Sequence, residues 1–142
     1  MSYDILNKED INDFDQFKKK CLDHNVYMVI HLAAVADLNI FAKSPEISHK
    51  INVEGTRNVL TVCNEMGIPM LFASTCCCYG NNGVHPSDED SPIAPTEDYA
   101  KSKAISEQDI LQNNPNKNHV CMRLATFYGP MMRPALAPAV FI

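Results

Sequence analysis

Three apolar runs of strand length alternate with helical patterns along this chain, and that alternation restricts its fold more than any other feature. The runs read "YMVIHLAA" (27–34), "PMLFAST" (69–75) and "HVCMRLA" (119–125). Each run is apolar at successive positions and therefore on both faces of a strand, which is typical of a parallel sheet that helices cover on both sides. The sequence thus predicts an α/β fold, with residues 1–142 in a single domain.

The segments around these runs carry the start and stop signals of helices. Asp13 predicts the N-cap of a first helix. A Ser–Pro pair at Ser44 predicts the start of a second helix, which ends at Gly67. The side chains of this second helix that we expect to face inward are Ile47, Ile51, Val59 and Cys63. A polar loop over 81–97 leads into a third helix over 98–111.

Composition and charge exclude several classes of protein. The chain has 142 residues, of which 46% are hydrophobic and 20% charged, and its net charge is −5. It lacks the clustered Lys and Arg of a nucleic-acid-binding surface, and no apolar run approaches the roughly 20 residues of a membrane span. The polar N-terminus lacks the apolar core of a signal peptide, so we expect a cytoplasmic protein with reduced thiols.

The six cysteines do not form a pattern that predicts a metal centre or a disulfide framework. Cys76, Cys77 and Cys78 are contiguous, and the chain contains no Cys-x-x-Cys pair. On an extended strand adjacent side chains point to opposite faces, which suits neither a disulfide nor tetrahedral zinc. We therefore expect no metal site. Two interpretations of the three cysteines stay open: packing beside a site, or a redox-sensing thiol.

Thr75, Tyr99 and Lys103 are the residues with the clearest potential for chemistry. Tyr99 and Lys103 lie four positions apart, so on a helix they share a face, and an ammonium beside a phenol lowers the tyrosine pKa. Such a tyrosine can remove a proton from an alcohol and return it. Thr75 ends the second apolar run, where ligands of open parallel sheets bind. Together the three residues predict a site at the carboxyl ends of the strands.

Six short segments add a resemblance that covers residues 10–130. In chain order they read "EDI", "VIHLAA", "NVEGT", "STCCCYG", "YAKSK" and "RLATFYGP". Their types and order resemble the NAD-dependent epimerase/dehydratase family of extended short-chain dehydrogenases/reductases, and within it nucleotide-sugar epimerases of the UDP-glucose 4-epimerase type. The resemblance implies an incomplete Rossmann-type, doubly wound parallel sheet, of which this chain would hold about strands 3 to 6.

The resemblance also implies roles for individual residues. Tyr99 would be the catalytic acid and base, Lys103 would lower its pKa and bind the nicotinamide ribose, and Thr75 would hydrogen-bond the reacting hydroxyl of the substrate. Thr126 stands where related epimerases often have an asparagine that helps to hold the nucleotide diphosphate. Besides Tyr99 and Lys103, the residues expected to contact NAD or NADP are Asp10, Ile11, Leu32, Ala33, Ala34, Val35 and Asn52.

The reaction that the resemblance implies is a transient oxidation of a hydroxyl on a nucleotide-sugar substrate, with NAD taking up a hydride and returning it. Related sugar dehydratases have an Asp–Glu pair, which drives water elimination, where this chain has Cys76 and Cys77. Because neither thiol can replace a carboxylic acid at that step, the cysteines argue against a dehydratase.

Two family features are missing from the sequence. All five glycines lie outside a Gly-rich phosphate-binding turn, and no segment resembles the C-terminal substrate domain. This predicts a fragment of an epimerase, which by itself binds NAD weakly or not at all, and whose first apolar run forms an open sheet edge. The alternative is an inactive fragment, or a module that pairs through this edge with a second copy or a complementing chain.

Overall fold

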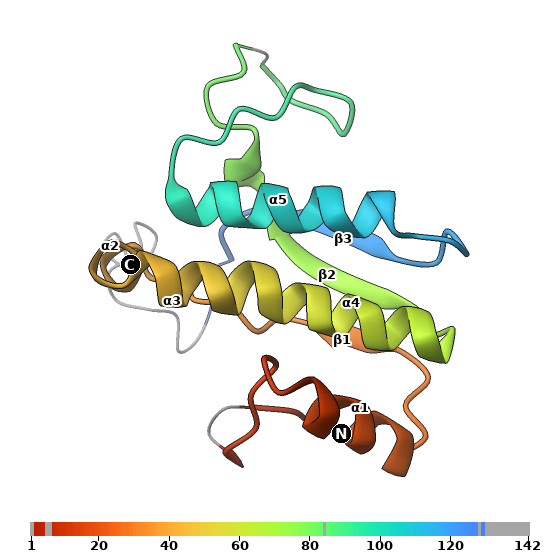
Figure 1. Ribbon diagram of the computed structural model, residues 1–142. Coiled ribbons are helices and arrows are strands. Elements are labelled where there is room, and N and C mark those ends of the chain that lie inside the picture. Colours follow the sequence, from red (N-terminus) through yellow and green to blue (C-terminus); the bar gives the residue numbers. More distant parts are fainter. Residues whose placement is uncertain (1, 5–6, 84, 128, 130–142) are drawn as a thin grey trace.

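The structure is a computed structural model, and it describes residues 2–4, 7–83, 85–127 and 129. Three parallel strands form one sheet in the order β1-β2-β3, as Figure 1 shows. Their bounds are Val29–His31 for β1, Met70–Thr75 for β2 and Val120–Leu124 for β3. Each strand lies within one of the three apolar runs, and the α/β fold class is confirmed.

The helices alternate with the strands along the chain. They are α1 (Phe14–Asp23), α2 (Leu38–Lys43), α3 (Pro45–His49), the π-helix η2 (Lys50–Glu54), α4 (Gly55–Met66), the short 3₁₀ helix η3 (Cys76–Cys78) and α5 (Asp98–Gln112). Asp13 caps α1 as predicted, because its side chain accepts a hydrogen bond from the backbone N–H of Gln16 at 3.0 Å. Gly67 ends α4 with a φ of +67°, which a glycine adopts without strain. The sequence did not predict α2, which Asp37 caps.

The second predicted helix is interrupted by η2, and this corrects one expected core residue. Val59 and Cys63 are buried on α4 as predicted, whereas Ile47 on α3 is 62% exposed. A π-turn contains more residues than an α-turn, so it rotates the preceding helix about its axis. The apolar spacing that joins Ile47 to Val59 in an unbroken α-helix is therefore lost, and the prediction for Ile47 was wrong.

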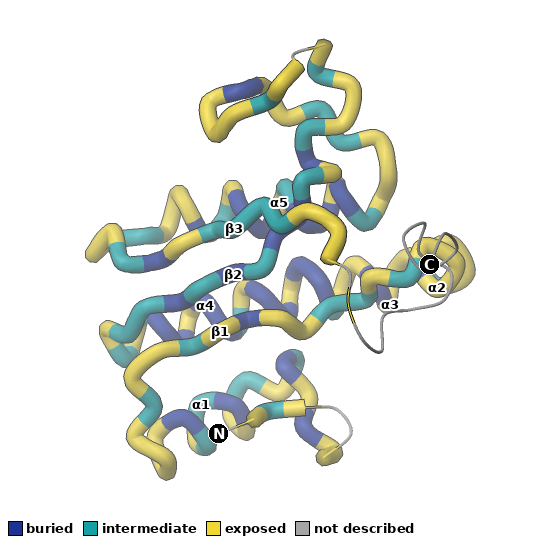
Figure 2. Tube along the Cα trace, turned by 180° about the vertical axis from the view of Figure 1, so that it is seen from behind, coloured by how far each residue is buried: buried dark blue, intermediate teal, exposed yellow. Residues whose placement is uncertain are grey.

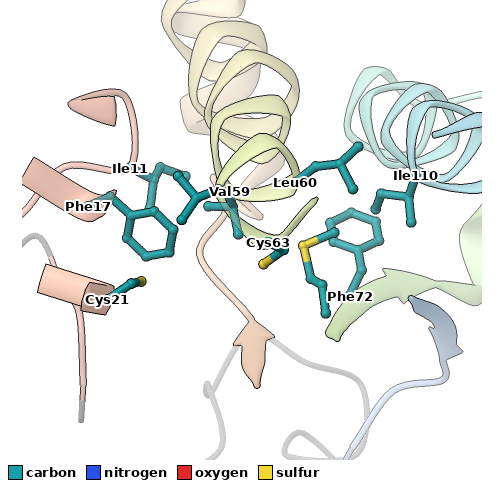
Figure 3. Close-up of a cluster of buried hydrophobic side chains, with 10 residues drawn as sticks. Ile11, Phe17, Cys21, Val59, Leu60, Cys63, Phe72 and Ile110 are labelled. Atoms are coloured by element: carbon teal, nitrogen blue, oxygen red, sulfur yellow. The ribbon is translucent and has the colours of Figure 1, made fainter. Parts of the chain in front are cut away.

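The hydrophobic core lies between the sheet and the two long helices α4 and α5. Phe72 of β2, Val59 of α4 and Ile110 of α5 are almost fully buried and belong to one cluster. Figure 3 shows that Ile11 and Phe17 join this cluster from the side of α4 that faces away from α5. One continuous core thus joins α1, α4, α5 and the sheet.

The opposite face of the sheet is bare, which corrects the expectation of helices on both sides. Ile30, Leu71 and Val120 are paired in register across the three strands. Ile30 is 56% and Val120 51% exposed. In Figure 2, seen from behind, the strands lie in front and α4 and α5 lie behind them. Within the described residues no helix covers this face, so its apolar side chains meet solvent.

The outer edge of the sheet is open at β1. Among the described residues β1 pairs with β2 alone, so the predicted open edge is confirmed for this part of the chain. Among the described residues the sheet has three strands, whereas the resemblance implies about four. None of the described helices combines the length and apolar character needed to cross a membrane.

Candidate active site

Thr75 closes β2 at the carboxyl edge of the sheet. Its side chain is buried, and Oγ1 accepts a hydrogen bond from the backbone N–H of Cys77 at 3.2 Å. This bond caps η3 and turns the chain away from the sheet. Because the hydroxyl acts here as an acceptor, its hydrogen can still be donated to a ligand.

Lys103 of α5 is buried against the same end of β2. The side chain is 2% exposed, its Nζ donates a hydrogen bond to the backbone carbonyl of Ala73 at 2.8 Å, and it lies 4.5 Å from the centroid of the Phe72 ring. Burial disfavours the ammonium form and lowers the pKa of Lys103 to about 8. A lysine that is partly neutral near physiological pH is therefore hydrogen-bonded to β2 two residues before Thr75.

Tyr99 lies one helical turn before Lys103 and is half-buried. Nζ of Lys103 is 6.0 Å from the centroid of its ring, because the ammonium is directed to the carbonyl of Ala73. Burial raises the pKa of Tyr99, and the nearby thiols of Cys77 and Cys78 raise it further. The shared helix face was predicted correctly, but the predicted lowering of the tyrosine pKa was wrong for this arrangement.

The turn after β1 brings small side chains to the same edge of the sheet. Leu32 and Ala33 are exposed, and Ala34 and Val35 are half-buried. Asn52, buried in η2, holds this turn with a pair of hydrogen bonds: Oδ1 accepts from the backbone N–H of Val35 at 2.7 Å, and Nδ2 donates to its carbonyl at 3.0 Å. The backbone of the turn is therefore fixed while its side chains stay small.

Asn52 also joins the turn to α5. Its Nδ2 donates to Oγ of Ser102, the neighbour of Lys103, at 3.0 Å. Its backbone carbonyl accepts hydrogen bonds from Oγ1 of Thr56 at 2.6 Å and from Oγ of Ser106 at 3.0 Å. Asn52 thus links the end of β1 to the helix that carries Tyr99 and Lys103.

His31 is a core residue, as the sequence indicated. Its Nε2 lies 2.9 Å from Oγ1 of Thr56, which already donates its hydrogen to Asn52, so Nε2 carries the proton and donates. Burial, together with the charge of Lys103, lowers the pKa of His31 to about 3. The imidazole is therefore neutral throughout the physiological range.

The other residues predicted to contact cofactor or substrate, Asp10, Ile11 and Thr126, lie outside the group formed by Thr75, Tyr99 and Lys103. The carboxylate of Asp10 accepts hydrogen bonds from the backbone and side chain of Asn12, both at 2.9 Å. Ile11 is a core residue, so close to α4 that a Cβ on Gly55 would meet its Cδ1 at 2.6 Å. Asp10 and Ile11 therefore belong to the α1 side of α4, away from α5. Thr126 is exposed just beyond β3.

A buried polar network beneath the site was not found by sequence reasoning. The carboxylate of Glu107 on α5 forms an ion pair with Arg123 on β3 and accepts a hydrogen bond from Ser74 of β2. Arg123 also donates to the hydroxyl of Tyr79 at 3.0 Å. The available sequence signals were an isolated charge within an apolar strand, Arg123, and a Glu one turn after Lys103.

The three contiguous cysteines form a 3₁₀ turn rather than an extended strand. Cys77 is exposed, Cys76 is half-buried and Cys78 is buried, and all three are free thiols. Sγ of Cys78 lies 3.6 Å from both Oγ of Ser74 and the carbonyl of Ala100. Burial raises the pKa of Cys76 and of Cys78, which favours the protonated thiols. Within the described residues no group of three or more His, Cys, Asp or Glu side chains is arranged to hold a metal ion.

A parallel sheet with a hydroxyl, a phenol and a buried amine at its carboxyl edge defines a Rossmann-like α/β protein with a candidate site for alcohol chemistry. The NAD dependent epimerase/dehydratase family matches this chain over residues 3–142. The chain belongs to that family.

Curated relatives differ in the substrates that their names give. The chain is 31% identical to UDP-glucose 4-epimerase of Rhizobium meliloti, over 78% of this chain and 34% of the relative. It is 30% identical to the decarboxylating sterol-4-alpha-carboxylate 3-dehydrogenase of Saccharomyces cerevisiae, over 88% of this chain and 37% of the relative. It is 32% identical to the 3 beta-hydroxysteroid dehydrogenase/Delta 5-->4-isomerase of Monkeypox virus, over 88% of this chain and 36% of the relative.

Solved structures agree with the fold. UDP-glucose 4-epimerase from Thermotoga maritima, solved with UDP-glucose, matches with a TM-score of 0.84 and 26% identity, over 94% of this chain and 46% of that structure. UDP-glucose 4-epimerase from Brucella ovis in complex with NAD matches with a TM-score of 0.73 and 26% identity, over 80% of this chain and 36% of that structure. The chain spans less than half of the length of each of these relatives and structures.

Proposed function

We propose that this chain carries part of the active site of an NAD-dependent epimerase, which oxidises and reduces a hydroxyl of a nucleotide sugar. The observation that carries the proposal is the gathering of Thr75, Tyr99 and Lys103 at the carboxyl end of β2, with the lysine buried. UDP-glucose 4-epimerases among the relatives and the solved structures support this substrate class. The six free cysteines are compatible with a reducing cytoplasm, where we place the protein.

The cofactor that we infer is NAD or NADP, which supplies the acceptor and donor of the hydride. The small side chains of Ala33 and Ala34 and the fixed backbone of Val35 fit a ligand that approaches the end of β1 closely. Lys103 can hydrogen-bond ribose hydroxyls from the other side. The described glycines do not form a Gly-rich turn, so these residues fit the nicotinamide–ribose part of the cofactor and not its pyrophosphate.

The proton chemistry that we assign to this chain is divided between two side chains. Tyr99 would take the proton of the substrate hydroxyl and return it, while Thr75 would donate a hydrogen bond to the reacting oxygen. Burial raises the pKa of Tyr99, so the phenolate becomes more abundant as the pH rises. Any turnover that begins with proton removal by Tyr99 should therefore be faster at alkaline than at neutral pH.

A sterol is the competing substrate class. Two of the three curated relatives described above act on sterols or steroids by name, at the same level of identity as the sugar epimerase. Leu32 and Phe127, both exposed beyond the carboxyl ends of β1 and β3, would suit an apolar ligand. Thr126 offers only one hydroxyl to hydrogen-bond a nucleotide diphosphate, which is a weak contact for a nucleotide sugar. We favour the nucleotide sugar because the solved epimerase structures match this chain over most of its length.

NMR chemical-shift perturbation of the 142-residue chain by NADH tests the proposed cofactor site, because it detects binding in the millimolar range. We expect the shifted resonances to include Ala33, Ala34 and Lys103. Lys103→Met should weaken these shifts. Lys101→Met, which removes an exposed lysine of the same helix, should leave them unchanged. Absent shifts, or shifts confined to other surfaces, would contradict the proposal. Titrations with UDP-glucose and with a 3β-hydroxysterol then distinguish the two substrate classes.

A second candidate function is that of an interaction module, and the open edge of β1 favours it. The backbone groups along the outer edge of β1 have no neighbouring strand among the described residues. Tyr27, just before β1, and Ile30, within β1, have exposed side chains. A second copy or a complementing chain could add a strand there. Light scattering of the wild-type chain and of Ile30→Lys tests this: an oligomer that the substitution dissociates supports the module, and a monomer at high concentration contradicts pairing between copies.

A further inference from the structure

Glu107 is a buried carboxylate next to the candidate site, on the helix that also carries Tyr99 and Lys103. It lies one helical turn after Lys103 on α5 and is 2% exposed. Its Oε2 accepts hydrogen bonds from Nε and Nη2 of Arg123 at 3.0 and 2.9 Å, and its Oε1 accepts one from Oγ of Ser74. The carboxylate therefore joins α5 to two neighbouring strands, β2 and β3.

Arg123 extends the network to the loop that follows η3. Its Nη1 donates to the hydroxyl of Tyr79 at 3.0 Å and to the backbone carbonyl of Glu89 at 3.2 Å. Its guanidinium also lies 4.9 Å from the centroid of the Tyr79 ring. The nitrogens of the guanidinium group thus all have acceptors, and the loop that leads to Tyr99 is held against β3.

Each partner in this network is a near neighbour of a candidate catalytic residue. Ser74 directly precedes Thr75, and Glu107 follows Lys103 at the spacing that places two side chains on one helix face. Tyr79 follows the 3₁₀ helix that Thr75 caps. The ion pair therefore connects the segments that carry Thr75, Lys103 and Tyr99.

A buried ion pair is weak evidence for stability, because desolvation of the two charges offsets most of their attraction. Apolar side chains of similar volume would hold these elements together as strongly. What an ion pair with directed hydrogen bonds adds is a defined relative position of the elements that it joins. The directed hydrogen bonds of Glu107 and Arg123 therefore point to a positional role and not to a stabilising one.

We propose that Glu107 and Arg123 are a positioning pair, which holds α5 against the carboxyl end of β2 and so keeps Lys103 buried beside Thr75. The catalytic meaning of this position rests on the proposed function. The position itself does not, because it is measurable without cofactor or substrate.

The titration of Lys103 reports how closely α5 is held to β2. Burial is the main reason why the pKa of Lys103 is lowered from 10.5 to about 8. The titratable groups facing it are Tyr99 on its own helix, Cys78 from η3 and His31 from β1. Any loosening of α5 admits water to Nζ and raises the pKa toward its ordinary value. A loss of global stability alone leaves the titration in the folded state unchanged.

The test is an NMR titration of the Lys103 Cε methylene in the 142-residue chain. For Glu107→Gln, which keeps the shape, the loss of the negative charge by itself lowers the Lys103 pKa. A rise therefore reports the entry of water to Nζ, and we expect a rise of about one unit or more. Asp109→Asn is the matched control, because Asp109 lies on the same helix as Glu107 and its ion pair with Arg57 of α4, at 2.7 Å, is more exposed. The control should leave the Lys103 pKa at its wild-type value. A folded Glu107→Gln chain with a wild-type Lys103 titration overturns the proposal.

Two milder variants decide the matter where Glu107→Gln does not fold. Arg123→Lys keeps the charge and loses the forked hydrogen bonds, and Ser74→Ala removes a single hydroxyl. Each should raise the Lys103 pKa by a smaller amount than Glu107→Gln, and wild-type titrations in both would overturn the proposal. A shifted Lys103 pKa in a chain that shows no NADH perturbation would reject the proposed function and leave the positioning pair supported.

Discussion

The two faces of the sheet differ, although the same three strands supply both. On the covered face Phe72 packs in one cluster with residues of α4 and α5, and the buried pair of Glu107 and Arg123 lies nearby. On the bare face Ile30 and Val120 are paired in register with Leu71 and are half exposed. The covered face is built by α4, which comes between β1 and β2 in the chain, and by α5, which comes between β2 and β3.

The difference between the two faces shows which parts of the candidate site are held in place by the described helices. Every group that positions Lys103 and Tyr99 comes from the covered side, because α5 carries both residues and packs on β2. The turn after β1, where Ala33 and Ala34 lie, borders the bare face and the open edge. We therefore expect Tyr99 and Lys103 to be well ordered in the isolated chain, and the turn at Ala33 and Ala34 to depend more on what covers the sheet.

The largest expected effect contrasts a side chain from each face. Phe72→Ala removes a fully buried ring from the core and should lower the free energy of unfolding by about 3 to 5 kcal/mol. Ile30→Ala truncates an apolar side chain that is 56% exposed and should cost roughly 1 kcal/mol or less. Urea denaturation of the two variants measures both values. Equal losses would show that the bare face is buried in solution.

The second prediction concerns the pH dependence of stability, through His31 on the covered face. Its pKa is about 3 in the folded chain and near 6.5 when unfolded, so the unfolded state binds the proton first. The contribution is fully present above pH 6.5 and is lost as the pH falls. Between pH 6.5 and 4.5 the chain should lose roughly 2.5 kcal/mol of stability through this group.

The variant His31→Gln isolates that contribution, because a glutamine amide can still donate to Thr56 and does not titrate. Its stability should vary much less between pH 6.5 and 4.5 than that of the wild-type chain. Part of the variation should remain, since burial also lowers the pKa of His119. An unchanged pH profile in His31→Gln would show that His31 is hydrated in solution.

The elements that the sequence predicted are those that local patterns specify. The cap at Asp13, the glycine end of α4, the three strands and the shared face of Tyr99 and Lys103 all follow from residues close together in the chain. Family membership was also accessible, because six short segments occur in the expected order.

What the sequence could not give depends on distant partners. The direction of the Lys103 ammonium is set by the carbonyl of Ala73, thirty residues earlier, so helix spacing alone suggested the wrong effect on Tyr99. The pairing of Glu107 with Arg123 likewise requires β3 to lie beside β2. The π-turn before α4 leaves no local signal, yet it turns Ile47 outward.

The substitution with the smallest expected effect, Val120→Lys, tests the bare face most directly. Val120 begins β3 and is 51% exposed beside Leu71. A lysine there can extend its charged end into water, so Val120→Lys should change the free energy of unfolding by less than about 0.5 kcal/mol. The same substitution at Val59, buried within α4, should prevent folding because it buries an unpaired charge. Denaturation curves of Val120→Lys at several protein concentrations separate two outcomes. No change at any concentration means that the face is free in solution, whereas a loss that grows with concentration means that another chain covers it in the wild-type protein.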